Sequence, residues 1–238
     1  EFEHAVAVAP TRAVVCQHAS NVTGAIQPVG DLADIARAHG AVMIVDGAQA
    51  AGHLEVDLGA LGADAYACSG HKGLLGPQGV GVLYLAPDFA PGELIQGGSG
   101  GNSEDAVQPR LRPDRYEAGT VNTPAVAGLG AAAALLSAEG ADLRRAEQRL
   151  TRRLHEGLLK IPGLTVLGPP PPERRVPVVS VVHNSLGGDE IAFALDTRYG
   201  IAVRSGLHCS PWAHETVGTL DSGAVRFGMG LGLADADV

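Results

Sequence analysis

Polar side chains of complementary chemistry follow two apolar runs in the first third of the chain. The run at residues 41–45 ends on the carboxylate of Asp46, and the run at residues 64–68 leads to Ser69, His71 and Lys72. Each run has the length and composition of a buried strand in a parallel sheet. Because ligands of open α/β sheets bind at the carboxyl ends of the strands, we expect these side chains to line one crevice.

This set of side chains suits pyridoxal phosphate. A buried carboxylate at Asp46 needs a cationic partner, which the protonated ring nitrogen of this cofactor would supply. The amine of Lys72 would form a Schiff base with the aldehyde of the cofactor. The residues alone leave structural roles open: Asp46 could be the N-cap of a following helix, Lys72 could be a surface charge, and His71 could be a structural histidine.

Cys209 is the candidate nucleophile. Arg204, His208 and His214 lie close to it in sequence, and Gly206 indicates a mobile loop. A cationic, partly exposed setting favours the reactive thiolate. A buried, inert cysteine and a zinc ligand are the alternatives, but the sequence lacks the second pair of ligands typical of zinc sites, so we predict no metal.

Two arginines near the C-terminus could bind the carboxylate of a substrate. Arg204 and Arg226 each carry a planar guanidinium, which grips a carboxylate through two parallel hydrogen bonds. Cys16 and Cys68 lie inside apolar runs, and we expect both to be buried.

Alternating apolar runs and helical patterns predict the α/β elements that would position these residues. A strand at 41–46 follows a helix at 32–39, capped by Asp31 and ended by Gly40, which indicates a βαβ unit. We place a domain boundary near Gly140, between domains at 1–139 and 140–238. The other predicted strands lie at 13–16, 64–68, 80–85, 176–183, 201–204 and 224–227, and the other helices at 125–138, 143–158 and 189–199.

The least regular part of the chain lies at residues 97–122. It contains the glycine-rich run 97–102, a proline-rich run at 109–113 and the pair Gly119-Thr120. Long loops in compact domains are often functional, although an ordinary surface loop is an equal alternative.

Composition and charge exclude some classes of function. The net charge of −9 argues against a nucleic-acid partner, which needs a basic surface. We find no uncharged apolar run of ~18 residues and therefore expect no membrane span. Three cysteines, an odd number, indicate free thiols in a reducing compartment, so we expect a cytoplasmic protein.

Four segments, at residues 20–24, 45–49, 69–73 and 204–209, resemble the class V aminotransferase family of pyridoxal-phosphate enzymes, and within it the cysteine desulfurases. The resemblance implies fold type I, with part of a large domain, mainly a parallel sheet, and a smaller C-terminal α/β domain. The chain begins at Glu1 without a methionine. The resemblance therefore implies a missing N-terminal portion, with a Gly/Thr-rich phosphate loop and a side chain that stacks on the ring.

The resemblance also implies roles for individual residues. Ser69 and His71 would donate to the cofactor phosphate, and Asn21 and Gln49 would contact the ring hydroxyl. Gly119 and Thr120 would contact the cofactor phosphate of a second copy, which implies a homodimer with shared active sites. Arg226 would bind the substrate carboxylate, whereas Arg204 could instead orient the cysteine loop.

The expected reaction is conversion of L-cysteine to L-alanine, with the sulfur held as a persulfide on Cys209 and passed to an acceptor protein or thiol. Transamination, β-lyase or epimerase chemistry on the same scaffold is the alternative within the enzymes. A non-catalytic partner chain is the alternative from another class.

Overall fold

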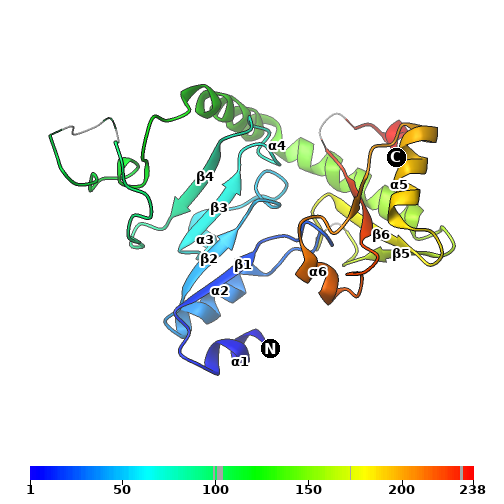
Figure 1. Cartoon of the computed structure of the whole chain (residues 1–238), viewed down its shortest axis with the longest axis horizontal. Coiled ribbons are helices and arrows are strands. Elements are labelled where there is room, and N and C mark those ends of the chain that lie inside the picture. Colours follow the sequence, from blue (N-terminus) through cyan, green and yellow to red (C-terminus); the bar gives the residue numbers. More distant parts are fainter. Residues whose placement is uncertain (99, 101–103, 172, 231–232) are drawn as a thin grey trace.

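The structure, a computed structural model, describes residues 1–98, 100, 104–171, 173–230 and 233–238. It contains two four-stranded sheets, and Figure 1 shows helix α4 extending from the first sheet to the second. The expected α/β fold class is confirmed.

The first part of the chain contains α1 Phe2–Ala7, β1 Ala13–Gln17, α2 Val29–Ala38, β2 Val42–Asp46, α3 Leu58–Leu61, β3 Ala65–Ser69 and β4 Gly81–Leu85. The rest contains η1 Asp114–Tyr116, α4 Thr123–Leu158, β5 Leu164–Leu167, β6 Val178–His183, α5 Gly188–Tyr199, β7 Arg204–Gly206, α6 Pro211–Thr216, β8 Ala224–Gly228 and η2 Asp235–Asp237.

The first sheet has the order β1-β2-β3-β4 and carries the predicted βαβ unit. Strands β1, β2 and β3 are parallel, whereas β4 runs antiparallel to β3. Met43 and Val45 of β2 are buried against Ala33 and Ala36 of α2. This alternation explains why β2 positions a side chain for chemistry: the residue after Val45 is directed out of the core, where the strand ends.

Helix α2 begins three residues before the predicted start. Pro28 is its N-cap, and Asp31 lies in the first turn instead of at the cap. A carboxylate in the first turn is stabilised by the positive end of the helix dipole, so the acidic residue marks the region but not the boundary. The predicted end is confirmed, because Gly40 takes a positive φ of 70° directly after the C-cap.

The second sheet is antiparallel and has the order β5-β6-β8-β7. Its core contains Val179, Val181 and Val225 together with Leu158 of α4. The sequence reading missed β5, whose four residues are too few for a clear pattern. It also placed a strand at 201–204, whereas β7 occupies Arg204–Gly206 and pairs with β8.

Helix α4 is one continuous helix of 36 residues, so the two separate helices predicted on either side of Gly140 are wrong. The sequence around Gly140 is rich in Ala, Leu, Glu and Arg, which are strong helix formers, and their combined preference exceeds the cost of one interior glycine. The predicted domain boundary at 139/140 falls inside this helix. The division into two domains stays a prediction.

By length and composition alone, α4 includes a stretch apolar enough to cross a membrane, and little of that stretch is buried. Core helices of soluble proteins meet the same criterion, so this is weak evidence for a membrane span. The stretch lies in the alanine-rich first half of the helix, because the second half carries many charged side chains. The expectation of no membrane span stays a prediction.

Two glycines hold the loops after β2 and β3 against each other. A Cβ at Gly52, whose φ is 89°, would lie 1.9 Å from the carbonyl oxygen of Gly73. In return, a Cβ at Gly73 would lie 2.4 Å from the carbonyl oxygen of Ala51. The loop that follows Asp46 and the loop that carries Lys72 therefore meet backbone to backbone, and only glycine permits this approach.

A Gly52→Ala variant tests this contact. We expect the free energy of unfolding to fall by about 3 kcal/mol, because the substitution combines a left-handed backbone with a steric clash. Gly30→Ala is the matched control: Gly30 lies in α2 with open space around its Cβ position, so the variant should gain up to ~1 kcal/mol. Urea unfolding measures both values, and equal stability of Gly52→Ala and the unsubstituted chain would contradict the contact.

Candidate active site

The carboxyl ends of β2 and β3 bring four predicted site residues to one edge of the first sheet. Asp46 is the last residue of β2, and in the parallel register it lies opposite Ala67, two residues before Ser69. His71 and Lys72 follow on the loop between β3 and β4, and both are exposed. This edge therefore presents a carboxylate, a hydroxyl, an imidazole and an amine to solvent.

The expectation that Asp46 is buried is wrong. Its side chain is exposed, and its Oδ1 accepts a hydrogen bond of 2.9 Å from the backbone N–H of Ala48. The alternative role as a helix N-cap is wrong, because a turn and not a helix follows Asp46. The bond to Ala48 instead holds this turn and fixes the direction of the carboxylate. Gln49 lies half-buried in the same turn.

The donor set at this edge fits pyridoxal phosphate. A fixed carboxylate matches the protonated ring nitrogen, an accessible amine matches the aldehyde, and the Ser69 hydroxyl and His71 imidazole can donate to a phosphate. The individual cofactor contacts of Asp46, Gln49, Ser69, His71 and Lys72 stay predictions.

A buried tyrosine, which the sequence reading missed, supports the turn after Asp46. A Cβ at Gly47 would lie 2.0 Å from the ring of Tyr66, so the turn rests directly on this ring. The Tyr66 hydroxyl shares a hydrogen bond of 3.0 Å with His18 Nδ1. Burial, with contributions from Cys68 and Asp46, raises the pKa of Tyr66, and burial lowers the pKa of His18, so both groups are neutral at pH 7. No sequence spacing links these two residues.

Cys209 lies on the loop between β7 and α6, with its side chain exposed. The guanidinium of Arg204 donates to its Sγ at 3.2 Å. His208 and Cys209 have φ values of 53° and 60°, in the left-handed region that residues other than glycine rarely adopt. A loop under such backbone strain needs strong contacts to hold it.

Asn21 supplies part of that hold from the loop after β1. Its Nδ2 donates to the carbonyl oxygen of His208 at 2.7 Å, and its Oδ1 accepts from the hydroxyl of Ser210 at 2.9 Å. Asn21 therefore contacts both residues that flank Cys209 in sequence. Its predicted contact with the ring hydroxyl of the cofactor stays a prediction.

The two candidate carboxylate-binding arginines are direct neighbours. Arg204 of β7 pairs with Arg226 of β8, and Arg226 also donates to the carbonyl oxygen of Asn21 at 3.0 Å. Burial lowers the pKa of Arg226, and the charge of Arg204 lowers it further. Two guanidinium groups side by side favour an anion between them, which agrees with either a substrate carboxylate or the Cys209 thiolate.

Gly119 and Thr120 lie elsewhere, on an exposed arm formed by residues 87–121. Figure 1 shows this arm extending away from both sheets. Positions 99, 101 and 102 of the predicted glycine-rich run 97–102 lie outside the described residues. Gly119 has a φ of 87°, and its N–H donates to the carbonyl oxygen of Gly98 at 2.7 Å.

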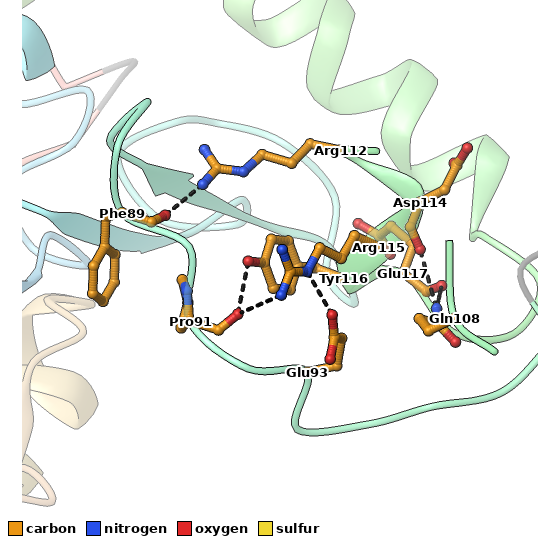
Figure 2. Close-up of polar contacts among 9 residues, drawn as sticks. All are labelled: Phe89, Pro91, Glu93, Gln108, Arg112, Asp114, Arg115, Tyr116 and Glu117. Carbon is orange, nitrogen blue, oxygen red and sulfur yellow. Dashed lines mark hydrogen bonds and ion pairs between the residues drawn. The ribbon is translucent and has the colours of Figure 1, made fainter. Parts of the chain in front are cut away.

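Side chains of the arm fold it onto itself, as Figure 2 shows. The arginine at 112 donates to backbone carbonyls at 85, 86 and 89. Arg115 pairs with Glu93 at 2.5 Å, and the hydroxyl of Tyr116 donates to the Pro91 carbonyl at 2.9 Å. Gln108 donates to two further carbonyls, at 114 and 117. These contacts give the arm a defined shape and tie its base to the end of β4.

The two cysteines of the first sheet are more accessible than the sequence predicts. Cys16 and Cys68 are half-buried, where full burial was expected, because both lie on strands of a sheet that is covered incompletely. In the part of the chain that the structure describes, no group of three or more His, Cys, Asp or Glu side chains could hold a metal ion.

Known proteins similar to this chain include several desulfurases. A probable cysteine desulfurase of Methanothermobacter thermautotrophicus is 38% identical over 224 residues, covering 88% of this chain and 55% of the relative. A cysteine desulfurase of Salmonella agona is 40% identical over 208 residues, covering 84% of this chain and 50% of the relative. This chain thus spans about half the length of the curated relatives it matches.

Solved structures agree with these relatives. The apo structure of a cysteine desulfurase from Thermococcus onnurineus superposes with a TM-score of 0.85 at 33% identity, covering 99% of this chain and 59% of that one. A cysteine desulfurase structure from Escherichia coli gives a TM-score of 0.85 at 28% identity, covering 97% of this chain and 57% of that one. The family model for class V aminotransferases matches residues 1–238, and the chain therefore belongs to the class V aminotransferase family.

Proposed function

We propose that the protein containing this chain is a pyridoxal-phosphate-dependent cysteine desulfurase, which converts L-cysteine to L-alanine and receives the sulfur on Cys209. The position of the Cys209 thiol carries this proposal. The thiol is exposed, lies 3.2 Å from a guanidinium, and sits on a loop that Asn21 ties to the sheet bearing Asp46. The desulfurase names of the relatives point to the same reaction.

The residues at the edge of the first sheet would bind the cofactor. When bound, pyridoxal phosphate supplies an electron sink that makes the α-proton of an amino acid acidic. Asp46 would keep the ring nitrogen protonated, and Ser69 and His71 would donate to the phosphate. Lys72, exposed on the neighbouring loop, would carry the cofactor and then take the proton from Cα of the substrate.

The arginines and Cys209 would act on the substrate itself. Arg226 would bind the carboxylate of L-cysteine, and Arg204 would stabilise the Cys209 thiolate through the contact at 3.2 Å. The thiolate attacks the sulfur of the substrate: the S–S bond forms, the Cβ–S bond breaks, and its electron pair stays on carbon. A proton delivered to Cβ and the return of the proton from Lys72 to Cα would then complete L-alanine. A persulfide would remain on Cys209, and an acceptor protein or thiol would remove its outer sulfur.

We also propose that the protein is a homodimer in which the arm reaches the second copy. The arm exposes Leu94 by 97% and Leu111 by 79%, which is costly for a monomer in water. Gly119 and Thr120 lie on the same exposed arm, where they could meet the phosphate of the other copy. We further propose a cytoplasmic location, since Cys16, Cys68 and Cys209 are free thiols.

Replacement of Cys209 by alanine tests the nucleophile. In the full-length protein supplied with cofactor, we expect Cys209→Ala to lower sulfur release from L-cysteine by roughly a hundredfold or more, since the sulfur loses its acceptor. Cys16→Ala on β1 is the control and should retain activity. Sulfur release by Cys209→Ala at the rate of the unsubstituted protein would instead favour β-lyase or related chemistry.

Replacement of Lys72 tests the cofactor site. This chain has only two lysines, Lys72 and Lys160, and both are exposed, so they form a matched pair. After pyridoxal phosphate is added to the full-length protein, we expect Lys72→Ala to lose the near-visible absorbance band of the lysine-bound cofactor, because no amine remains at that edge. Lys160→Ala should keep the band. A band that survives in Lys72→Ala would show that another amine carries the cofactor.

A further inference from the structure

A chain of buried polar side chains lies behind Cys209. His208 and His214 are 2% and 0% exposed, and Thr219 is 6% exposed. Nδ1 of His208 lies 3.2 Å from Nε2 of His214, and Nδ1 of His214 lies 2.8 Å from the hydroxyl of Thr219. At the other end, Nε2 of His208 lies 3.0 Å from the carbonyl oxygen of Arg204.

The carbonyl at one end sets the direction of every hydrogen bond. A carbonyl only accepts, so His208 must carry its proton on Nε2, and its Nδ1 must accept. His214 therefore donates from Nε2, which leaves its Nδ1 to accept from the Thr219 hydroxyl. Burial lowers the pKa of both histidines, and the charges of Arg226 and Arg204 lower that of His208 further. Hydrogen bonds to the backbone of Arg204 and Thr219 oppose this shift, but the net direction is downward and favours the neutral forms that this order needs.

The chain ends on the residue that contacts the thiol. The backbone carbonyl of Arg204 accepts from His208, while its guanidinium donates to Cys209 Sγ at 3.2 Å. The side chain of His208 is hydrogen-bonded to His214, and the backbone carbonyl of His208 accepts a hydrogen bond of 2.7 Å from Asn21. His208 is therefore linked to both ends of the thiol–guanidinium contact: its imidazole bonds to the backbone of Arg204, and its own backbone leads directly into Cys209.

We propose that His214 is a positioning residue for Cys209: by accepting from Thr219 and donating to His208, it keeps the strained loop closed and the thiol beside Arg204 and Arg226. This inference rests on the proposed function, because it assigns Cys209 as the reacting thiol. It goes beyond that function by naming a fully buried residue that sets the surroundings of the thiol.

The charge preference of Cys209 alkylation reports this positioning without any turnover. Iodoacetate is an anion and iodoacetamide is its neutral analogue, so the ratio of their rates measures the positive charge around the thiol. The ratio cancels changes in thiol ionisation and exposure that affect both reagents. Mass spectrometry of the peptide that contains Cys209, in the full-length protein, separates this thiol from the other cysteines.

In His214→Leu we expect the iodoacetate-to-iodoacetamide ratio to fall about fourfold, as one unit charge moving away from about 5 Å in water predicts. His214→Gln should restore much of the ratio, because its amide can still donate to His208. His39→Leu, an exposed histidine at the end of α2, is the control and should leave the ratio unchanged. An unchanged ratio in folded His214→Leu would overturn the proposal.

Thr219→Val keeps the test decisive if His214→Leu does not fold. It removes one hydroxyl with little change in shape, leaves His214 Nδ1 without its donor, and should lower the ratio in the same direction. An unchanged ratio in Thr219→Val would then overturn the proposal. Failure of the proposed function would appear separately, as sulfur release that survives Cys209→Ala.

The pH dependence of the ratio has a definite sign. Each histidine has a lowered pKa in the closed loop and the ordinary value of about 6.5 when the loop opens, so the open form binds more protons as the pH falls. A proton on His208 Nδ1 would also face the donor of His214. The facing charges are Arg204 of β7 and Arg226 of β8. The ratio should therefore decline as the pH falls below about 6.5, and a ratio that stays constant to pH 5 would contradict the proposal.

Discussion

The hydrogen bonds of Asn21 determine how the two halves of the chain form one site. The candidate cofactor-binding residues lie at the carboxyl ends of β2 and β3 in the first sheet, whereas the Cys209 thiol lies on a loop of the second sheet. Asn21 follows β1, yet its amide contacts the residues on both sides of Cys209 at 2.7 and 2.9 Å, and its carbonyl accepts from Arg226 at 3.0 Å. One side chain and its own carbonyl thus link three segments that are distant in sequence.

The surrounding junction explains why Asn21 can be held so firmly. Next to it, the carbonyl of Val22 accepts from the Ser180 hydroxyl of β6 at 2.5 Å. Arg175, 2% exposed, donates to three backbone carbonyls and keeps its charge although burial lowers its pKa to about 10. These carbonyls replace the water that the guanidinium loses, so a buried cation is tolerated and fixes the backbone around it. Buried Ala19, Ala50, Val176 and Val178 pack together beside this junction.

A feature can be predicted from the sequence when residues adjacent in the chain produce it, and not when it depends on residues that only the fold brings together. The strands β1, β2 and β3 and the polar residues at their ends could be predicted, because each strand is a short continuous apolar run and the site begins where the run stops. Helix α6 could have been found from Pro211 after Ser210, a typical helix start. In contrast, the histidine chain joins a backbone carbonyl of β7 to side chains of the following loop and of α6. The contact of His18 with Tyr66 likewise joins the loop after β1 to β3. Only the folded backbone brings those groups together.

The neutrality of the histidine chain follows from the charges it must support. The loop already places Arg204 opposite Arg226 in adjacent strands, which is a repulsive pair unless an anion lies near it. A protonated imidazole behind these arginines would add a third positive charge in a buried place and would raise that repulsion. Neutral histidines instead supply hydrogen bonds without adding charge. The positive charges of the two guanidinium groups therefore remain available to attract the thiolate and the substrate carboxylate. The buried histidines and the two arginines therefore have separate tasks: the histidines hold the loop, and the arginines attract the reacting anions.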